Sequence, residues 1–219
     1  MSAGQLFNTL ISRPRPSDAP FEWTSPGDLK EARGLLKDFC PAAQKIWSHV
    51  DSCMKWTLGE VKDAQYVSST GRCVLIGDAA HAFAPHSGQG AAMALEDAVA
   101  LADFVTSAQH ETDLSRSMTA FQNFRKPRVE NVRTVAYGNQ EFFCMEDGPK
   151  QQERDALWAA MTKAWKAEWR ELGDEGYKSR PKPKAVPSQD MRSPEGRMYV
   201  YGYDVFFEVK KVMGDVNVF

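Results

Sequence analysis

The sequence lacks several features by which a protein's environment or partner is recognised. It contains no run of about 18 consecutive apolar residues, so we expect no membrane-spanning helix and no membrane partner. Its formal net charge is only -2, which gives no reason to expect nucleic acid as a partner. No basic region precedes the short apolar patch near the N-terminus, so residues 1–18 make a poor signal peptide.

Cysteine is also scarce, and the chain of 219 residues holds only Cys40, Cys53, Cys73 and Cys144. None of them forms a C-x-x-C pair, and their spacing fits no familiar metal framework, so we expect no metal site. Cys73 lies in an apolar run and is interpreted as a small buried side chain. Because disulfide frameworks belong to oxidising compartments, this cysteine usage favours a reducing, cytoplasmic setting.

A third absence concerns nucleotide binding. The chain contains no G-x-G-x-x-G, the turn that follows the first strand of a Rossmann fold and binds the ADP part of a dinucleotide. The composition is otherwise ordinary for a globular protein, with 42% hydrophobic and 26% charged residues. The length is enough for one or two small domains with a real core.

The most informative stretch runs from Arg72 to Ala98, RCVLIGDAAHAFAPHSGQGAAMALEDA. Residues 73–76 are apolar and rich in β-formers, which predicts a central parallel strand. Asp78 follows where such a strand would open onto a crevice, and a glycine-rich loop then leads into a helix over residues 90–107. A helix N-terminus presents free N–H groups and a positive dipole end, which suit an electron-rich ligand. From these residues alone, an ordinary connection in which the glycines serve only the turn is as well supported as a ligand site.

This stretch resembles the second FAD-contacting motif of the single-component FAD-dependent aromatic hydroxylases, the salicylate hydroxylase-like flavoprotein monooxygenases. The likeness covers GDAAH at 77–81, Pro85, GQG at 88–90 and EDA at 96–98, with the spacing of the motif kept. The resemblance implies that Asp78 holds the ribityl hydroxyls of FAD and that the backbone of the GQG turn approaches the flavin ring. The implied cofactor-binding residues are Gly77, Asp78, Pro85, Gly88, Gln89, Gly90 and Ala91. It assigns no catalytic side chain.

The resemblance also implies a fold class and a domain organisation. The chain is expected to be a mixed α+β, helix-rich protein with a partial, Rossmann-like FAD-binding fold that lacks the N-terminal βαβ unit. Residues 1–70 would be a remnant of the substrate domain, and residues 71–172 the C-terminal part of the FAD-binding domain with its long helices. Residues 173–219 would form a linker and a tail whose YGYD element, residues 201–204, packs back on the main body.

Hydrophobic periodicity predicts the remaining elements. Helices are expected over residues 29–39 (capped by Ser25 or Asp28), 42–50, 113–127 and 155–172, and strands over 6–11 and 55–61. Further helix is expected beyond Pro127, which either ends the helix before it or only kinks it. In the helix at 155–172, the stripe that contains Trp165 and Trp169 is interpreted as core rather than as a platform for a ligand.

Charged and imidazole side chains in and after the motif receive mostly structural interpretations. Glu96 and Asp97 are read as solvated residues that complement the helix dipole, and the basic residues of FRKPR at 124–128 as a solvated face. His81 is predicted to be structural. His86 either lines an active site or is an ordinary loop residue.

The activity that the resemblance implies is NAD(P)H- and O2-dependent hydroxylation of an aromatic or polycyclic small molecule, with FAD as cofactor. Because the likeness covers only the C-terminal half of the family's architecture, three hypotheses stay open. The chain is a fragment or split member that needs a complementing chain, a truncated homologue that acts without FAD as a cyclase or isomerase of secondary metabolism, or a non-enzymatic remnant. Bare apolar surface would favour a homodimer.

Overall fold

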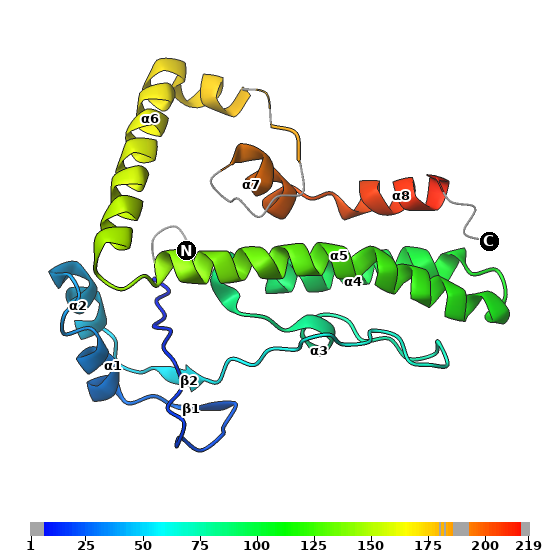
Figure 1. Cartoon of the computed structure of the whole chain (residues 1–219), viewed down its shortest axis with the longest axis horizontal. Coiled ribbons are helices and arrows are strands. Elements are labelled where there is room, and N and C mark those ends of the chain that lie inside the picture. Colours follow the sequence, from blue (N-terminus) through cyan, green and yellow to red (C-terminus); the bar gives the residue numbers. More distant parts are fainter. Residues whose placement is uncertain (1–6, 180, 182, 186–192, 216–219) are drawn as a thin grey trace. The chain divides into compact units, whose positions relative to one another are not determined.

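The computed structural model describes residues 7–179, 181, 183–185 and 193–215. Figure 1 shows that helices dominate the chain and that its sheet is small. The contacts within the chain divide it into two compact units, Met1–Leu58 and Gly59–Phe219. Each unit has its own structure and is described by itself.

The first unit consists of two short helices and a two-stranded antiparallel sheet. Strands β1 (Thr24–Pro26) and β2 (Met54–Trp56) pair with Thr24 opposite Trp56. The carboxylate of Asp28 accepts the N–H of Lys30 at 2.7 Å, which caps helix α1 (Leu29–Leu35) as predicted. Helix α2 (Pro41–Ser48) begins with a proline, which suits the first turn because that position needs no N–H donor.

Several boundaries in this unit differ from the sequence prediction. Helix α1 ends at Leu35 rather than residue 39, and the following residues form a tight turn. Among the described residues, 7–11 contain no strand, and the strand expected over 55–61 ends at Trp56. The reason is that a strand is stable only where a neighbour supplies hydrogen-bond partners, and β1 reaches no further.

The core of the second unit lies between a pair of long helices and the C-terminal segment. Helix α4 (Gly90–Ser107) packs along α5 (Glu111–Phe143), and α8 (Val205–Asp215) packs on α4 (Figure 1). The main cluster of buried side chains is Tyr66, Ala80, Ala100, Phe104, Met118, Phe121, Val205 and Val209. The bounds of α4 confirm the predicted helix over residues 90–107.

Helix α5 is one continuous helix that passes through Pro127, so of the two alternatives left open by the sequence, this proline does not end the helix. Its buried side chains include Val129, Val132, Val135 and Ala136, as their three- and four-residue spacing predicted. Proline removes one backbone donor from a helix, but the buried side chains on both sides of Pro127, from Ser117 to Ala136, keep α5 intact.

Helix α6 (Pro149–Ser179) begins earlier than predicted and is broken at Gly173, whose φ of 65° and ψ of 178° are not helical. The prediction that the stripe with Trp165 and Trp169 forms core is wrong, because these two side chains are 48% and 44% exposed. After the break, the helix resumes as far as Ser179, where an extended linker was expected. Most of the remaining linker lies outside the described residues.

The predicted central strand over residues 73–76 is also wrong. It is reduced to one antiparallel bridge between Val67 and Val74, because the described residues contain no strand that could flank it. Leu75 and Ile76 are therefore exposed rather than buried. Cys73, predicted to be buried, is exposed for the same reason.

Candidate functional site

The glycine motif forms a connected turn between two short helices and α4. Gly77, with φ 59°, precedes α3 (Asp78–His81), and Gly88, with φ 64°, ends the 3-10 turn η2 (Pro85–Ser87). Both glycines occupy the left-handed region, which a side chain would strain. A Cβ on Gly77 would lie 3.2 Å from the Cβ of Ala94, whereas nothing lies within 4 Å of one on Gly88. The backbone at Gly88 is therefore open to a ligand.

The structure brings Asp78 beside the start of α4. Its Oδ1 atom lies 4.0 Å from the position that a Cβ on Gly90 would occupy, and the side chain is exposed. The side chain of Gln89, the residue before α4, makes no capping hydrogen bond. The first helical bond runs from the N–H of Met93 to the carbonyl of Gln89 at 2.9 Å, so the N–H groups of Gly90 and Ala91 have no acceptor within the helix.

The turn that holds Pro85 is fixed by two other helices. Asn139 of α5 donates to the carbonyl of His86 at 3.0 Å, and Tyr201 of α7 (Pro194–Tyr201) donates to the carbonyl of Ser87 at 3.3 Å. The Oγ atom of Ser87 is buried and has no hydrogen-bond partner among the described residues. Pro85 itself is exposed, and His86 contributes its backbone to this tether while its side chain stays half-buried.

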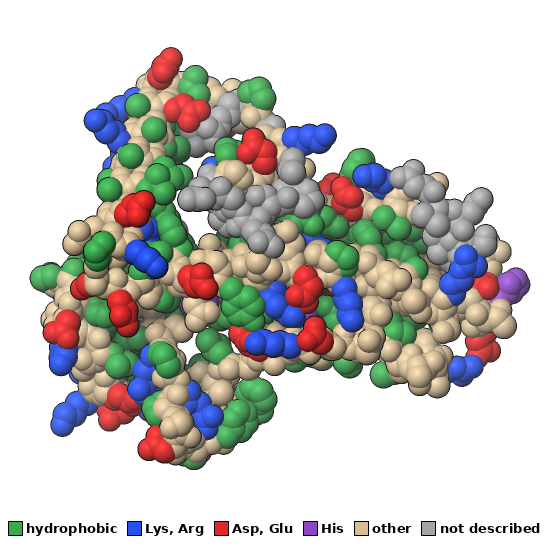
Figure 2. Space-filling view, in the orientation of Figure 1, with side chains coloured by type: hydrophobic (Ala, Val, Ile, Leu, Met, Phe, Trp, Pro, Cys, Tyr) green, Lys and Arg blue, Asp and Glu red, His purple; other side chains and the backbone are tan. Residues whose placement is uncertain are grey.

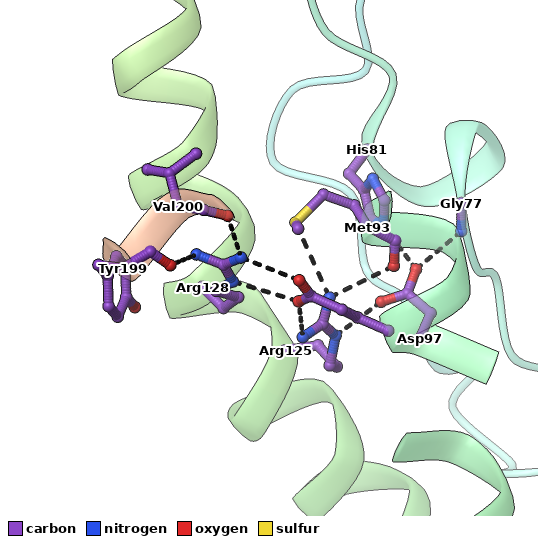
Figure 3. Close-up of polar contacts among 9 residues, drawn as sticks. Gly77, His81, Met93, Asp97, Arg125, Arg128, Tyr199 and Val200 are labelled. Carbon is purple, nitrogen blue, oxygen red and sulfur yellow. Dashed lines mark hydrogen bonds and ion pairs between the residues drawn. The ribbon is translucent and has the colours of Figure 1, made fainter. Parts of the chain in front are cut away.

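Behind the turn lies a buried ionic cluster centred on Asp97 (Figure 3). One carboxylate oxygen of Asp97 accepts the N–H of Gly77 at 2.9 Å and lies 2.6 Å from Nε2 of His81. The other accepts Nε of Arg125 at 2.7 Å. Since an ionised Asp97 can only accept, the Nε2 atom of His81 carries the proton. His81 is structural, as predicted.

Glu96 extends the same cluster toward the C-terminal segment. It accepts hydrogen bonds from Arg125 at 2.8 Å and from Arg128 at 2.9 and 3.2 Å. Arg128 also donates to the carbonyls of Tyr199 and Val200 at 2.8 and 3.1 Å (Figure 3). Its guanidinium lies over the ring of Tyr203, 4.1 Å from the ring centroid. The tail around YGYD therefore packs back on the main body, as the resemblance implied.

These four side chains correct the interpretation made from the sequence. Glu96, Asp97, Arg125 and Arg128 were predicted to be solvated, yet they are 8%, 1%, 0% and 2% exposed. A signal was present in the spacing, because Phe121, Arg125, Arg128 and Val132 share one face of a helix. Two acids and two arginines balance in charge, which is the condition under which buried ions are tolerated.

Burial and pairing shift the pKa values in this region. Burial alone would raise the pKa of Asp97, but the hydrogen bonds from His81 and Arg125 hold it below its ordinary range. The pKa of Arg125 is raised: burial opposes this, and the charges of Glu96 and Asp97 outweigh it. Burial raises the pKa of Tyr203 to about 12. Asp97 and Arg125 thus favour their charged forms, and this buried pair is suited to holding the turn in place.

The described residues contain no group of three or more His, Cys, Asp or Glu side chains that could hold a metal ion. None of the helices within the described ranges is both long enough and apolar enough to cross a membrane.

Comparison with known proteins finds a family whose sequences resemble this chain. A model of an FAD binding domain matches residues 30–136. Salicylate hydroxylase of Pseudomonas putida is 32% identical over 134 residues, which cover 60% of this chain and 30% of that protein. FAD-dependent monooxygenase atnJ of an Arthrinium species is 28% identical over 152 residues, which cover 69% and 36%. The chain spans about a third of the length of the curated relatives that it matches.

Solved structures agree with the fold. A salicylate hydroxylase substrate complex matches 91% of this chain and 41% of that chain, with a TM-score of 0.60 at 24% identity. CtdE in complex with FAD and a substrate also matches 91% of this chain and 42% of that one, with a TM-score of 0.58 at 19% identity.

The helix pair and the glycine turn at its end thus have the fold of flavoprotein monooxygenases. Within that class, the chain is similar to the FAD-dependent aromatic hydroxylases over part of their length. The family resemblance predicted from the motif is confirmed.

Proposed function

We propose that this chain forms the part of an FAD site that holds the ribityl chain and the flavin ring. The observation that carries the proposal is the position of Asp78, whose carboxylate lies beside Gly90 at the uncapped N-terminus of an 18-residue helix. A carboxylate accepts hydrogen bonds from ribityl hydroxyls, and free helical N–H groups suit the electron-rich edge of a reduced flavin. The remaining proposed contacts are Gly77, Pro85, Gly88, Gln89 and Ala91.

The residues present fit such a group. The space next to Gly88 would allow a planar ring to approach the backbone, and the buried Ser87 Oγ atom would gain a partner if a ligand or water reached it. The left-handed φ at Gly88 keeps that position free of a side chain. The ionic cluster around Asp97 then fixes the Gly77 end of the turn.

The reaction that we propose is NAD(P)H- and O2-dependent hydroxylation of a small aromatic or polycyclic compound. FAD, when bound, supplies the chemistry that accepts hydride and activates oxygen. This chain's residues bind and orient the flavin and exclude water from one side of it. Relatives named salicylate hydroxylase and 3-amino-4-hydroxybenzoate 2-monooxygenase support an aromatic substrate.

The organisation proposed with this function follows the resemblance. Residues 1–70 belong to a substrate domain, residues 71–172 to a partial, Rossmann-like FAD-binding domain, and residues 173–219 to a linker and tail. The ADP half of the cofactor would be held by a G-x-G-x-x-G unit on a complementing chain or on a further part of the same protein. The free cysteines Cys40, Cys53, Cys73 and Cys144 support a cytoplasmic setting, and a homodimer remains part of the proposal.

Flavin titration tests the proposal. Riboflavin, FMN and FAD are each added to the folded chain, and binding is followed by flavin fluorescence. All three should bind with similar affinity, because the contacts that we propose reach only the part that they share. In Asp78→Asn, the affinity should fall about tenfold, since a hydrogen bond to a charged group is lost. Asp103→Asn, in the body of α4 and away from the glycine turn, should leave the affinity unchanged.

Absence of flavin binding up to about 100 μM by a chain with native circular dichroism would contradict the proposal. A cofactor site that functions has a lower dissociation constant than this. Such a result would favour the hypothesis of a truncated homologue that acts without FAD. Equal loss of affinity in Asp78→Asn and Asp103→Asn would also contradict it, because the effect would then not come from the turn.

A further inference from the structure

Helix α6 carries a stripe of exposed apolar side chains that the proposed flavin site does not use. We call it the tryptophan stripe, and its members are Trp158, Met161, Trp165, Trp169 and Leu172. Their exposed fractions lie between 37% and 48%. Figure 2 shows hydrophobic side chains gathered along this helix. Single exposed apolar residues are normal on a protein surface, but a continuous stripe of this kind marks an interaction site.

The stripe lies on one side of an amphipathic helix. Lys163, Lys166, Arg170 and Glu171 occupy the other sides, because they are out of phase with the three- and four-residue steps of the stripe. An arrangement of this kind is stable in water when the apolar side is covered by another element. Helix α6 begins at Pro149, beyond the matched FAD-binding segment, which ends at residue 136. The stripe is therefore not part of that segment.

The spacing of the stripe is symmetric about Trp165. Met161 and Trp169 lie four residues before and after it, and Trp158 and Leu172 lie seven residues before and after it. Reversal of the helix direction therefore places an apolar residue opposite every apolar residue. This property is what an isologous two-fold contact needs, because in such a contact residue i meets residue j and residue j meets residue i.

We propose that the tryptophan stripe is the contact surface of a homodimer in which α6 packs antiparallel against α6 of a second copy of this chain. Trp165 lies on the two-fold axis and faces its own copy. Met161 faces Trp169 of the partner, and Trp158 faces Leu172. The 3-4-4-3 spacing covers fourteen residues in four steps, an average of 3.5, which matches the seam of two helices that cross at a shallow angle.

The available area supports a reversible dimer. A tryptophan side chain buries up to about 250 Å² at a contact, so three that are nearly half exposed offer about 350 Å² per copy. Met161 and Leu172 with the adjacent Leu157, each about two-fifths exposed, raise the total toward about 550 Å². Specific interfaces begin at about 600 Å² per partner, and neighbouring polar side chains would supply the remainder.

The first turns of α6 are held in place by contacts with the end of α5. Trp158 packs in a cluster with Phe142 and Phe143, with ring centroids 5.7 and 5.8 Å apart. Arg154 donates to the carbonyl of Phe142 at 2.8 Å, which joins the end of α5 to the first turns of α6. A contact surface that is already held in place loses less conformational entropy on association.

Sedimentation velocity of the full chain over a range of concentrations tests the proposal. The wild type should change from monomer to dimer at micromolar concentration. Trp165→Glu should weaken the dimer at least tenfold, because two like charges would meet on the axis. Ala167→Glu adds the same charge on the opposite side of α6 and should leave the dimer unchanged. A wild type that stays monomeric up to about 100 μM, or a dimer insensitive to Trp165→Glu, would overturn the proposal.

Cross-linking tests the register even if Trp165→Glu folds poorly. In a background where Cys40, Cys53, Cys73 and Cys144 are serine, Trp165→Cys should form a disulfide-linked dimer on mild oxidation. Trp158→Cys alone should not form such a dimer. When it is mixed with the Leu172→Cys variant, a disulfide should link one copy of each. Efficient cross-linking of Trp158→Cys to itself would indicate parallel helices and overturn the proposal. None of these readouts depends on flavin, so they can fail independently of the proposed function.

Discussion

The Nε atom of Arg125 lies 2.7 Å from Oδ1 of Asp97, and these side chains are 0% and 1% exposed. Through its second oxygen, Asp97 also accepts the N–H of Gly77. The long helix α5 is therefore connected, through one carboxylate, to the glycine turn that precedes Asp78. Any change to this pair should affect both the stability of the helices and the position of the proposed flavin contact.

Removal of the charge of Asp97 should strongly destabilise the protein. In Asp97→Asn, the shape of the side chain is kept, but the cluster of Arg125, Arg128 and Glu96 carries an unbalanced positive charge away from water. Breaking one partner of a buried ion pair costs about 3–5 kcal/mol, so the free energy of unfolding in urea should fall by that amount. Asp103→Asn, on the same helix, should change it by less than about 0.5 kcal/mol.

The contribution of Asp97 should disappear in acid. Its pKa is lower in the folded state than its ordinary 3.8, so the folded protein favours the charged form. The stabilisation is present above the pKa of the unfolded state and is lost as the pH falls through the folded pKa. The difference in unfolding free energy between wild type and Asp97→Asn should therefore shrink below about pH 4. A difference that shrinks instead as the pH rises above neutral would contradict this assignment.

Arg128→Lys should loosen the C-terminal segment. A lysine ammonium cannot reproduce the fork that contacts Glu96 and the carbonyls of Tyr199 and Val200, nor its stacking on Tyr203. We expect a loss of about 2–4 kcal/mol in unfolding free energy and faster proteolysis within α7 and α8. Arg116→Lys changes an exposed arginine of the same helix and serves as the control. Equal proteolysis of the two variants would show that Arg128 does not retain the tail.

Three glycine-to-alanine variants should behave differently. Gly77→Ala should lower stability by about 1–3 kcal/mol, because its φ is positive and the new Cβ would press on Ala94. Gly88→Ala should cost only about 1 kcal/mol but weaken flavin binding, because the Cβ enters open space at the turn. Gly138→Ala, in α5 with nothing within 4 Å, should stabilise by about 0.5–1 kcal/mol. Thermal unfolding and flavin titration of all three distinguish these effects.

The sequence predicts that the long helices exist, and gives the bounds of α4, because helical periodicity is local. Helix α4 begins and ends where the pattern indicates, and Asp28 caps α1 as expected. The strands fail because a strand depends on neighbours that no local pattern reveals. Residues 73–76 have the composition of a central strand, but only the bridge between Val67 and Val74 forms.

The polar cluster was missed for a different reason. Charged residues on a helix are usually solvated, and the sequence prediction for Glu96 and Arg125 follows that rule. Their burial becomes favourable only because each is the ionic partner of the other, twenty-nine residues away in the sequence. The prediction for the tryptophans of α6 is wrong in the opposite direction: large apolar residues usually indicate core, but these side chains are exposed. Spacing shows which residues share a face of a helix, as Arg125 does with Phe121, but it does not show whether another element covers that face.

The contact between Arg128 and the tail also constrains when the protein can fold. Arg128 and the carbonyl of Val200 are 72 residues apart in sequence, whereas Asp97 and Arg125 are only 28 apart. During synthesis, α5 would emerge from the ribosome well before the carbonyls and the ring that contact the guanidinium of Arg128. The contacts of Arg128 with residues 199–203 must therefore be completed later than the contact between Asp97 and Arg125.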